Sequence, residues 1–220
     1  MQLNPIATEL TTAATDALIA ALAAGCAVVL QGWRQRDRWK VAVWSWVFGL
    51  LAVAALLGAL SHGLMLSDST QSLLWQPLFL SLGLVVALFV VAAVYDWRGR
   101  GTARRAVPVM LVVALLFYAV TQIGNGTFLL FVLYEAAAML CALAMYVSLA
   151  VRRSLTGAGW IAAGIGLNIL AAAIQASGSI SITIIWPFDH NGVFHLVQIV
   201  AIVVLMRGLV NSLQAGRWSG

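Results

Sequence analysis

Apolar residues in this chain form seven long runs separated by short polar connections. A helix needs about 20 consecutive, mostly apolar residues to cross the hydrocarbon core of a membrane. The runs cover residues 15–33, 41–65, 73–95, 106–123, 127–150, 158–176 and 192–213. They predict an all-α fold in which residues 1–220 form a single domain, a bundle of seven transmembrane helices.

Composition supports a membrane environment. Hydrophobic residues make up 63% of the chain and charged residues only 9%, which lies outside the range of soluble domains. We therefore expect a multi-pass integral membrane protein, of the kind found in a bacterial inner (cell) membrane, with membrane lipids as partners.

The basic residues occur only in alternate connections and at the C-terminal end. They are Arg34, Arg36, Arg38, Lys40, Arg98, Arg100, Arg104, Arg105, Arg152, Arg153, Arg207 and Arg217. The connections 67–72, 124–126 and 177–191 contain none, so the positive-inside rule places the N-terminus outside and the C-terminus in the cytoplasm. The net charge of +5 comes from these clusters rather than from a basic face, which argues against nucleic-acid binding.

Two segments near the sixth run bear on packing. Small residues at 159 and 163, and at 162 and 166, are spaced for close helix–helix contact in lipid. The apolar stretch 180–186, in the one long outer connection, is expected to extend the sixth helix or to lie at the membrane interface.

Polar residues that could carry chemistry gather in the outer half of the predicted bundle. The chain has three histidines, and the topology places His62, His190 and His195 near the outer ends of the second and seventh helices. The same half also contains Asp16, Glu135, Gln175 and Asp189. Because ionisable groups at membrane depth are costly, this pattern predicts a polar chamber that opens outward.

Three histidines suggest a zinc site. Three imidazoles and a water form the open arrangement of catalytic zinc, in which the pKa of the water falls towards about 7. His190 and His195 are five residues apart, about 140° on a regular helix. If Asp189 or Asn191 caps the helix, His190 would lie on non-helical backbone and could fold back towards His195. The alternatives are hydrogen-bonding or helix-end roles, and haem ligation.

The carboxylates and the single lysine have their own interpretations. Glu135 is expected to act as a general base, a partner of a histidine or a fourth ligand, or else to hydrogen-bond Gln175 or Tyr134. Asp16 is interpreted as structural. Lys40 is expected in a cytoplasmic connection, which argues against a retinal Schiff base.

Two short motifs and the layout of the helices resemble the CREST superfamily of alkaline ceramidases, progestin and adiponectin receptors and related membrane hydrolases. Residues 59–63 stand where that family has a serine and a histidine late in helix two, and residues 190–195 stand where it has a histidine pair. The resemblance implies a zinc site formed by His62, His190 and His195 and hydrolysis of a lipid amide. Ser61, Glu135 and Asp189 are the candidate catalytic residues; Gly58 occupies the position of the family serine.

The leading hypothesis is a zinc-dependent hydrolase of a lipid amide or ester, with substrate entering laterally from the outer leaflet. The alternatives are a receptor or sensor with the same fold but no efficient turnover, and a small proton-coupled transporter. The oligomeric state is left open.

Overall fold

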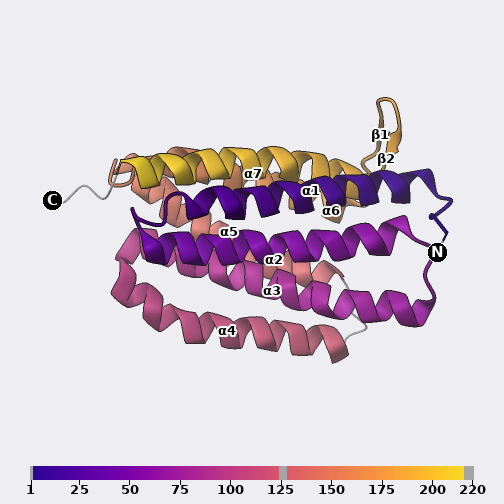
Figure 1. The fold of residues 1–220 in the computed structure, drawn as a ribbon, viewed down its shortest axis with the longest axis horizontal. Coiled ribbons are helices and arrows are strands. Elements are labelled where there is room, and N and C mark those ends of the chain that lie inside the picture. The colour runs from indigo at the N-terminus through magenta and orange to yellow at the C-terminus, as the bar shows by residue number, and fades with distance from the viewer. Residues whose placement is uncertain (1, 124–127, 216–220) are drawn as a thin grey trace.

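The computed structural model describes residues 2–123 and 128–215. Within these residues, seven helices are long and apolar enough to cross a membrane, which confirms the predicted all-α bundle (Figure 1). The helices are α1 (Ala7–Gln31), α2 (Arg38–Gly63), α3 (Asp68–Arg98), α4 (Arg100–Ile123), α5 (Phe128–Val151), α6 (Ala158–Ser177) and α7 (His190–Gln214). Arg217 and the connection 124–126 lie outside the described residues.

Successive helices run in opposite directions along the bundle (Figure 1). Helix α1 packs against both α2 and α7, and α3 packs against α2, α4 and α5, while α6 joins α5 to α7. Helix α4 lies at the edge, held mainly by α3. We call the end of the bundle with connections 32–37 and 152–157 the arginine-rich end, and the opposite end, with connections 64–67 and 178–189, the histidine end.

Several helices extend beyond the apolar runs that predict them. Helix α1 begins at Ala7 rather than at residue 15, and α3 and α4 are separated only by Gly99, whose φ of 85° requires the left-handed region that glycine tolerates. The predicted connection 96–105 is therefore almost entirely helical. Hydropathy identifies the part of a helix suited to lipid, whereas arginine, threonine and glutamate can continue the same helix into water.

A buried ion pair holds the arginine-rich end together. The Lys40 ammonium donates to both carboxylate oxygens of Asp96, at 2.8 Å and 2.9 Å, and the Tyr146 hydroxyl donates to the same carboxylate at 2.9 Å. Asp37 caps α2 by accepting from the Lys40 backbone N–H. The expectation that Lys40 lies in a connection is thus wrong, because Lys40 is a buried residue in the first turn of α2.

Helices α6 and α7 touch through glycines, but not through the predicted pairs. Added Cβ atoms at Gly159 and Gly166 would meet nothing within 4 Å. The close contacts instead involve Gly164, which lies against Leu205, and Gly208, which lies against Ile161. Helix α6 does make a close helix contact through a small residue, but at Gly164 rather than at the predicted glycines Gly159 and Gly166.

Replacing Gly208 with alanine should destabilise the bundle by about 1–3 kcal/mol, the usual effect of overpacking. A Cβ at Gly208 would lie 2.6 Å from Cγ1 and 2.7 Å from the backbone nitrogen of Ile161, so α7 would have to move away from α6. Thermal unfolding of the purified protein in detergent measures the effect. Gly166→Ala is the matched control, because alanine there meets open space and is the better helix former; equal loss in both variants would contradict the prediction.

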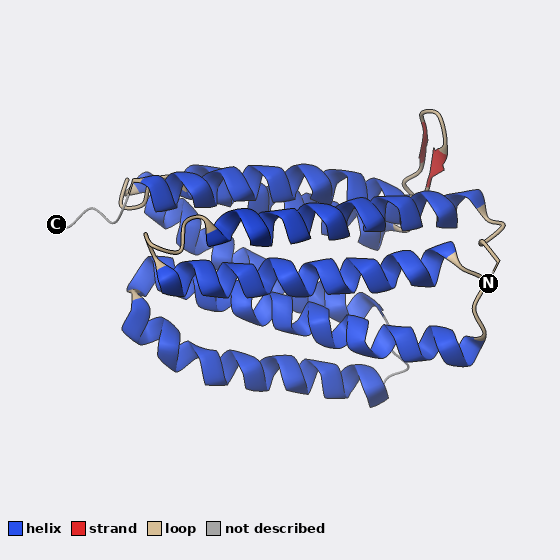
Figure 2. Cartoon of the chain, in the orientation of Figure 1, coloured by secondary structure: helices blue, strands red, loops and turns tan. Residues whose placement is uncertain are grey.

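The connection 178–189 forms a small antiparallel hairpin at the histidine end, rather than extending α6 (Figure 2). Its strands are β1 (Ile182–Thr183) and β2 (Pro187–Phe188). The hairpin is tied to α1 because the Thr11 hydroxyl donates to the Pro187 carbonyl at 2.8 Å. This contact positions the start of α7, which follows directly.

Candidate functional site

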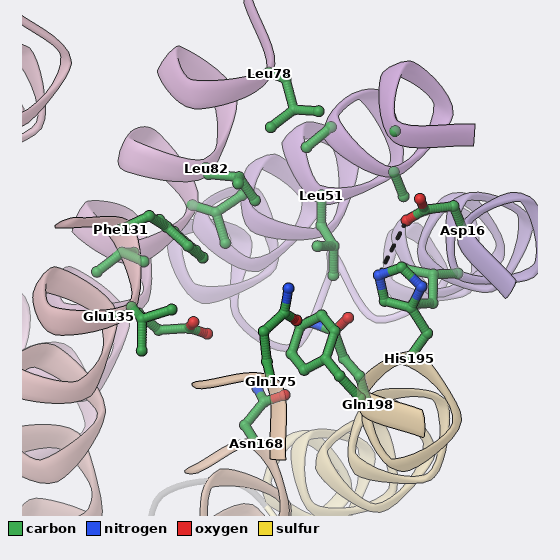
Figure 3. A pocket seen from close by; sticks show the side chains of 18 of the residues that line it. Asp16, Leu51, Leu78, Leu82, Phe131, Glu135, Asn168, Gln175, His195 and Gln198 are labelled. Carbon is green, nitrogen blue, oxygen red and sulfur yellow. Dashed lines mark ion pairs between the residues drawn. The ribbon is translucent and has the colours of Figure 1, made fainter. Parts of the chain in front are cut away.

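A cavity of about 500 Å³ lies inside the bundle and is lined by residues of α1, α2, α3, α5, α6 and α7. Most of its wall is apolar, from side chains such as Leu51, Leu82 and Phe131 (Figure 3). Its polar lining residues are Asp16, His62, Glu135, Asn168, Gln175, His190, Asn191, His195 and Gln198. The size and the few polar groups are typical of a site for a small organic ligand.

His195 is fixed by two residues of α1. Its Nδ1 lies 3.0 Å from the Thr15 hydroxyl oxygen, and its Nε2 lies 3.4 Å from Oδ1 of Asp16 (Figure 3). The Thr15 hydroxyl also lies within 3.0 Å of the carbonyl oxygens of Thr11 and Thr12, which can only accept. When the Thr15 hydroxyl donates its proton to one of these carbonyls, its oxygen accepts a hydrogen bond from Nδ1–H of His195. Nε2 of His195 is then the nitrogen that shares a proton with the Asp16 carboxylate.

Asp16 is buried between α1 and α2, with 6% of its surface exposed. Its carboxylate covers Gly58 so closely that a Cβ there would lie 2.7 Å from Oδ2. Gly58 is one helical turn from His62 on the same face of α2. Gly58, which stands where the CREST superfamily has a serine, therefore makes room for the Asp16 carboxylate.

His62 is oriented by Glu9, whose Oε2 lies 2.7 Å from Nδ1 of the imidazole. The ring also packs edge-on against Trp75 at 6.2 Å between centroids. The N-terminal segment covers this end of α2, since the Asn4 amide donates to the His62 carbonyl at 3.1 Å. With Nδ1 held by Glu9, Nε2 is the nitrogen of His62 left for a ligand.

The start of α7 combines a cap with a histidine. Asp189 is the N-cap, and its Oδ1 accepts from the Gly192 N–H at 3.0 Å and from the Thr12 hydroxyl at 3.5 Å. The predicted cap is confirmed, but His190 is the first helical residue rather than part of a non-helical segment. His190 and His195 therefore point about 140° apart around α7, although both line the cavity.

The remaining two predicted catalytic residues, Ser61 and Glu135, form no hydrogen bond with a histidine in the described structure. Ser61 is buried, its hydroxyl has no hydrogen-bond partner in the described structure, and it is not among the residues that line the cavity. Glu135 does line the cavity, on the side opposite Asp16 and His195 (Figure 3). Its expected hydrogen bonds are absent from the described residues: Gln175 donates to Asn191, and Tyr134 donates to the Gly83 carbonyl.

These residues provide suitable ligands for zinc, although the side chains as they stand do not form a closed metal site. In the described part of the chain, no three His, Cys, Asp or Glu side chains are close enough to hold a metal ion. The orientation of two histidines nevertheless suits one. Metal-binding imidazoles usually donate their second N–H to a carboxylate or another acceptor, and Glu9 and Thr15 occupy that position for His62 and His195.

A protein-family model matches residues 11–214, from the second turn of α1 to the end of α7. The chain belongs to DUF6962, a family of unknown function. The matched region contains every candidate site residue except Glu9. No curated protein and no solved structure matches the chain, so the resemblance to the CREST superfamily stays a prediction.

Two residues of α1, Glu9 and Thr15, were missed as site residues, and Asp16 was placed in the predicted polar chamber but interpreted as structural. A signal was present in the sequence, because Glu9 and Asp16 are seven residues apart and so share one face of a helix. That face becomes visible only when the helix is known to begin before Glu9, at Ala7.

Proposed function

We propose that this protein is a multi-pass membrane hydrolase with its N-terminus outside and its C-terminus in the cytoplasm. It would cleave an amide or ester bond of a lipid-like molecule held in the cavity, using zinc held by His62, His190 and His195. The basic connections support the orientation through the positive-inside rule, which puts the histidine end outside.

The observation that carries this proposal is the orientation of two imidazoles beside a carboxylate. Glu9 and Thr15 hold the Nδ1 atoms of His62 and His195. Nε2 of His62 is therefore available to a ligand, and Nε2 of His195 faces the Asp16 carboxylate at 3.4 Å. His62, His195 and Asp16 all line one cavity with otherwise mainly apolar walls. A few polar groups in a mainly apolar cavity suit a molecule with an acyl chain and a polar scissile bond.

Each group at the site would have a separate role in the proposed hydrolysis. When bound, zinc would polarise the scissile carbonyl and favour ionisation of a water. Asp16 is placed to accept the proton of the attacking water and to return it to the leaving nitrogen or oxygen. Thr15 and Glu9 keep the two imidazoles from rotating, and the apolar wall excludes bulk water from the acyl chain.

Metal content tests the proposal directly. Mass spectrometry of the detergent-purified protein should find about one zinc per chain, because a structural or catalytic zinc binds tightly. His62→Ala and His195→Ala should each lose the zinc, since each removes a ligand. Gln31→Ala, at the arginine-rich end, should keep it.

Activity is then measured on a panel of fluorogenic lipid amides and esters. Turnover that requires zinc and both histidines would support the hydrolase. A wild-type protein that is folded and monodisperse but contains no zinc after growth with added zinc would contradict it.

One observation favours a second candidate function, binding of a lipid-like ligand without turnover. The described histidines do not form a closed metal site, and Nε2 of His195 already contacts Asp16. A receptor or sensor needs only the cavity and its polar end. A zinc-free protein that binds lipids with a measurable affinity would select this function over the hydrolase.

A further inference from the structure

Glu135 is a buried carboxylate for which the described structure provides no partner. Its residue is 8% exposed, and it lines the cavity on the side opposite Asp16 and His195 (Figure 3). No side chain among residues 2–123 and 128–215 donates a hydrogen bond to it or pairs with its charge. A lone carboxylate at membrane depth is costly, so a bound molecule is a natural source of the missing partner.

The neighbouring wall adds unpaired oxygens. Oδ1 of Asn168 and Oε1 of Gln175 are fully buried and have no hydrogen-bond partner in the described structure. Asn168 and Glu135 line both the main cavity and a smaller crevice of about 170 Å³ between α5 and α6. The wall shared by Glu135 and Asn168 therefore offers hydrogen-bond acceptors without protein donors, and a ligand bound against it must supply the donors.

We propose that Glu135 and Asn168 bind the ammonium group of an amphiphilic amine. The substrate class would then be lipid-like molecules that carry an amine. This inference rests on the proposed function, because it takes the cavity as the substrate site. A protonated amine carries three N–H donors and no acceptor, and its charge compensates that of Glu135. A neutral alcohol of the same length would leave the carboxylate without a counter-charge.

The position of Glu135 fits such a substrate. Counted from the nearer ends of their helices, His195 lies about one and a half turns in, Glu135 about two turns, and Asp16 and Asn168 about two and a half turns; Glu135 lies opposite Asp16 and His195 in the cavity (Figure 3). An ammonium at Glu135 would therefore lie across the cavity from the proposed reacting groups, with the scissile bond between the two. Apolar residues of the same helix, such as Phe131 and Met139, line the cavity beside Glu135 and can contact the chain.

The test compares dodecylamine with dodecanol by isothermal titration calorimetry on the full chain in detergent at neutral pH. Wild type should bind the amine at least about tenfold more tightly than the alcohol, because only the amine completes the charge pair. Glu135→Gln should lose this preference, with its affinity for the alcohol unchanged. Glu135→Asp should keep part of it, and Asp68→Asn, which removes an exposed carboxylate at the start of α3, should keep all of it.

Three results would overturn the inference. The first is equal binding of amine and alcohol by wild type, and the second is an undiminished preference in Glu135→Gln. The third is competition by sodium but not by potassium or choline, which would assign the wall to an inorganic cation. Zinc content, measured in the same Glu135→Gln preparation, separates the two proposals. Loss of amine selectivity with zinc retained would support the role of Glu135 without testing the zinc site. Zinc-free wild type would contradict the hydrolase without testing the amine site.

Discussion

Replacing Lys40 with methionine should lower the free energy of unfolding by about 3–5 kcal/mol, because it leaves the Asp96 carboxylate buried without its counter-charge. The side chains of Lys40 and Asp96 are only 5% and 3% exposed, and the ammonium contacts both carboxylate oxygens. The Tyr146 hydroxyl alone cannot compensate the charge. Unfolding in detergent, titrated with sodium dodecyl sulfate, measures the change.

Two further variants show whether the pair is the cause. Lys40→Met with Asp96→Leu should recover most of the lost stability, because the double change removes both charges from the interior. Arg38→Met removes an exposed cation in the same turn of α2 and should change stability by no more than about 0.5 kcal/mol. A double variant as unstable as the single one would show that Lys40 acts through packing rather than charge.

The sequence predicted the helices well because a membrane imposes a simple requirement. Each crossing needs about 20 apolar residues, and the seven runs correspond to the seven helices. The ends were less predictable because nothing in hydropathy marks where a helix continues past its apolar part. The early start of α1 at Ala7 and the helical Arg100–Arg105 segment are both of this kind.

The sequence predicted that the three histidines lie together, but it did not predict which side chains contact them. That three histidines line one cavity follows from topology, since His62, His190 and His195 fall at the same end of their helices. Their partners depend on which helices are neighbours and how each is rotated. Asp16 reaches His195 only because α1 packs against α7, and no local pattern in the chain reports that contact.

Lys40 illustrates the same limit at the other end of the bundle. Its neighbours Arg34, Arg36 and Arg38 are exposed, so a charge-counting argument assigns the whole cluster to water. Lys40 alone faces inward, because it lies in the first turn of α2 on the side of Asp96. The ion pair with Asp96 of α3 accompanies the burial of Lys40, which composition alone would place in water.

If the protein is the proposed hydrolase, Asp16→Asn should reduce kcat/KM for its lipid-like substrate by about 10²–10⁴-fold, the usual effect of losing a general base. Asparagine has nearly the same shape and so fits over Gly58, where the carboxylate leaves no room for a larger group. The amide cannot accept the proton of the attacking water as a carboxylate does. Steady-state kinetics, with zinc content and unfolding measured on the same preparation, checks the result.

Thr15→Val provides the comparison that separates chemistry from architecture at this pair. Thr15 contacts the other nitrogen of His195 and acts only by orienting the ring, so its loss should lower activity about 10–100-fold, as is usual when such an orienting partner is removed. Both residues are buried in α1, and both contact α7 through His195. If Asp16 and Thr15 only joined α1 to α7, Asp16→Asn and Thr15→Val would lose similar amounts of stability and keep similar activity. A proton-transfer role for Asp16 requires that Asp16→Asn lose far more activity than Thr15→Val while remaining folded.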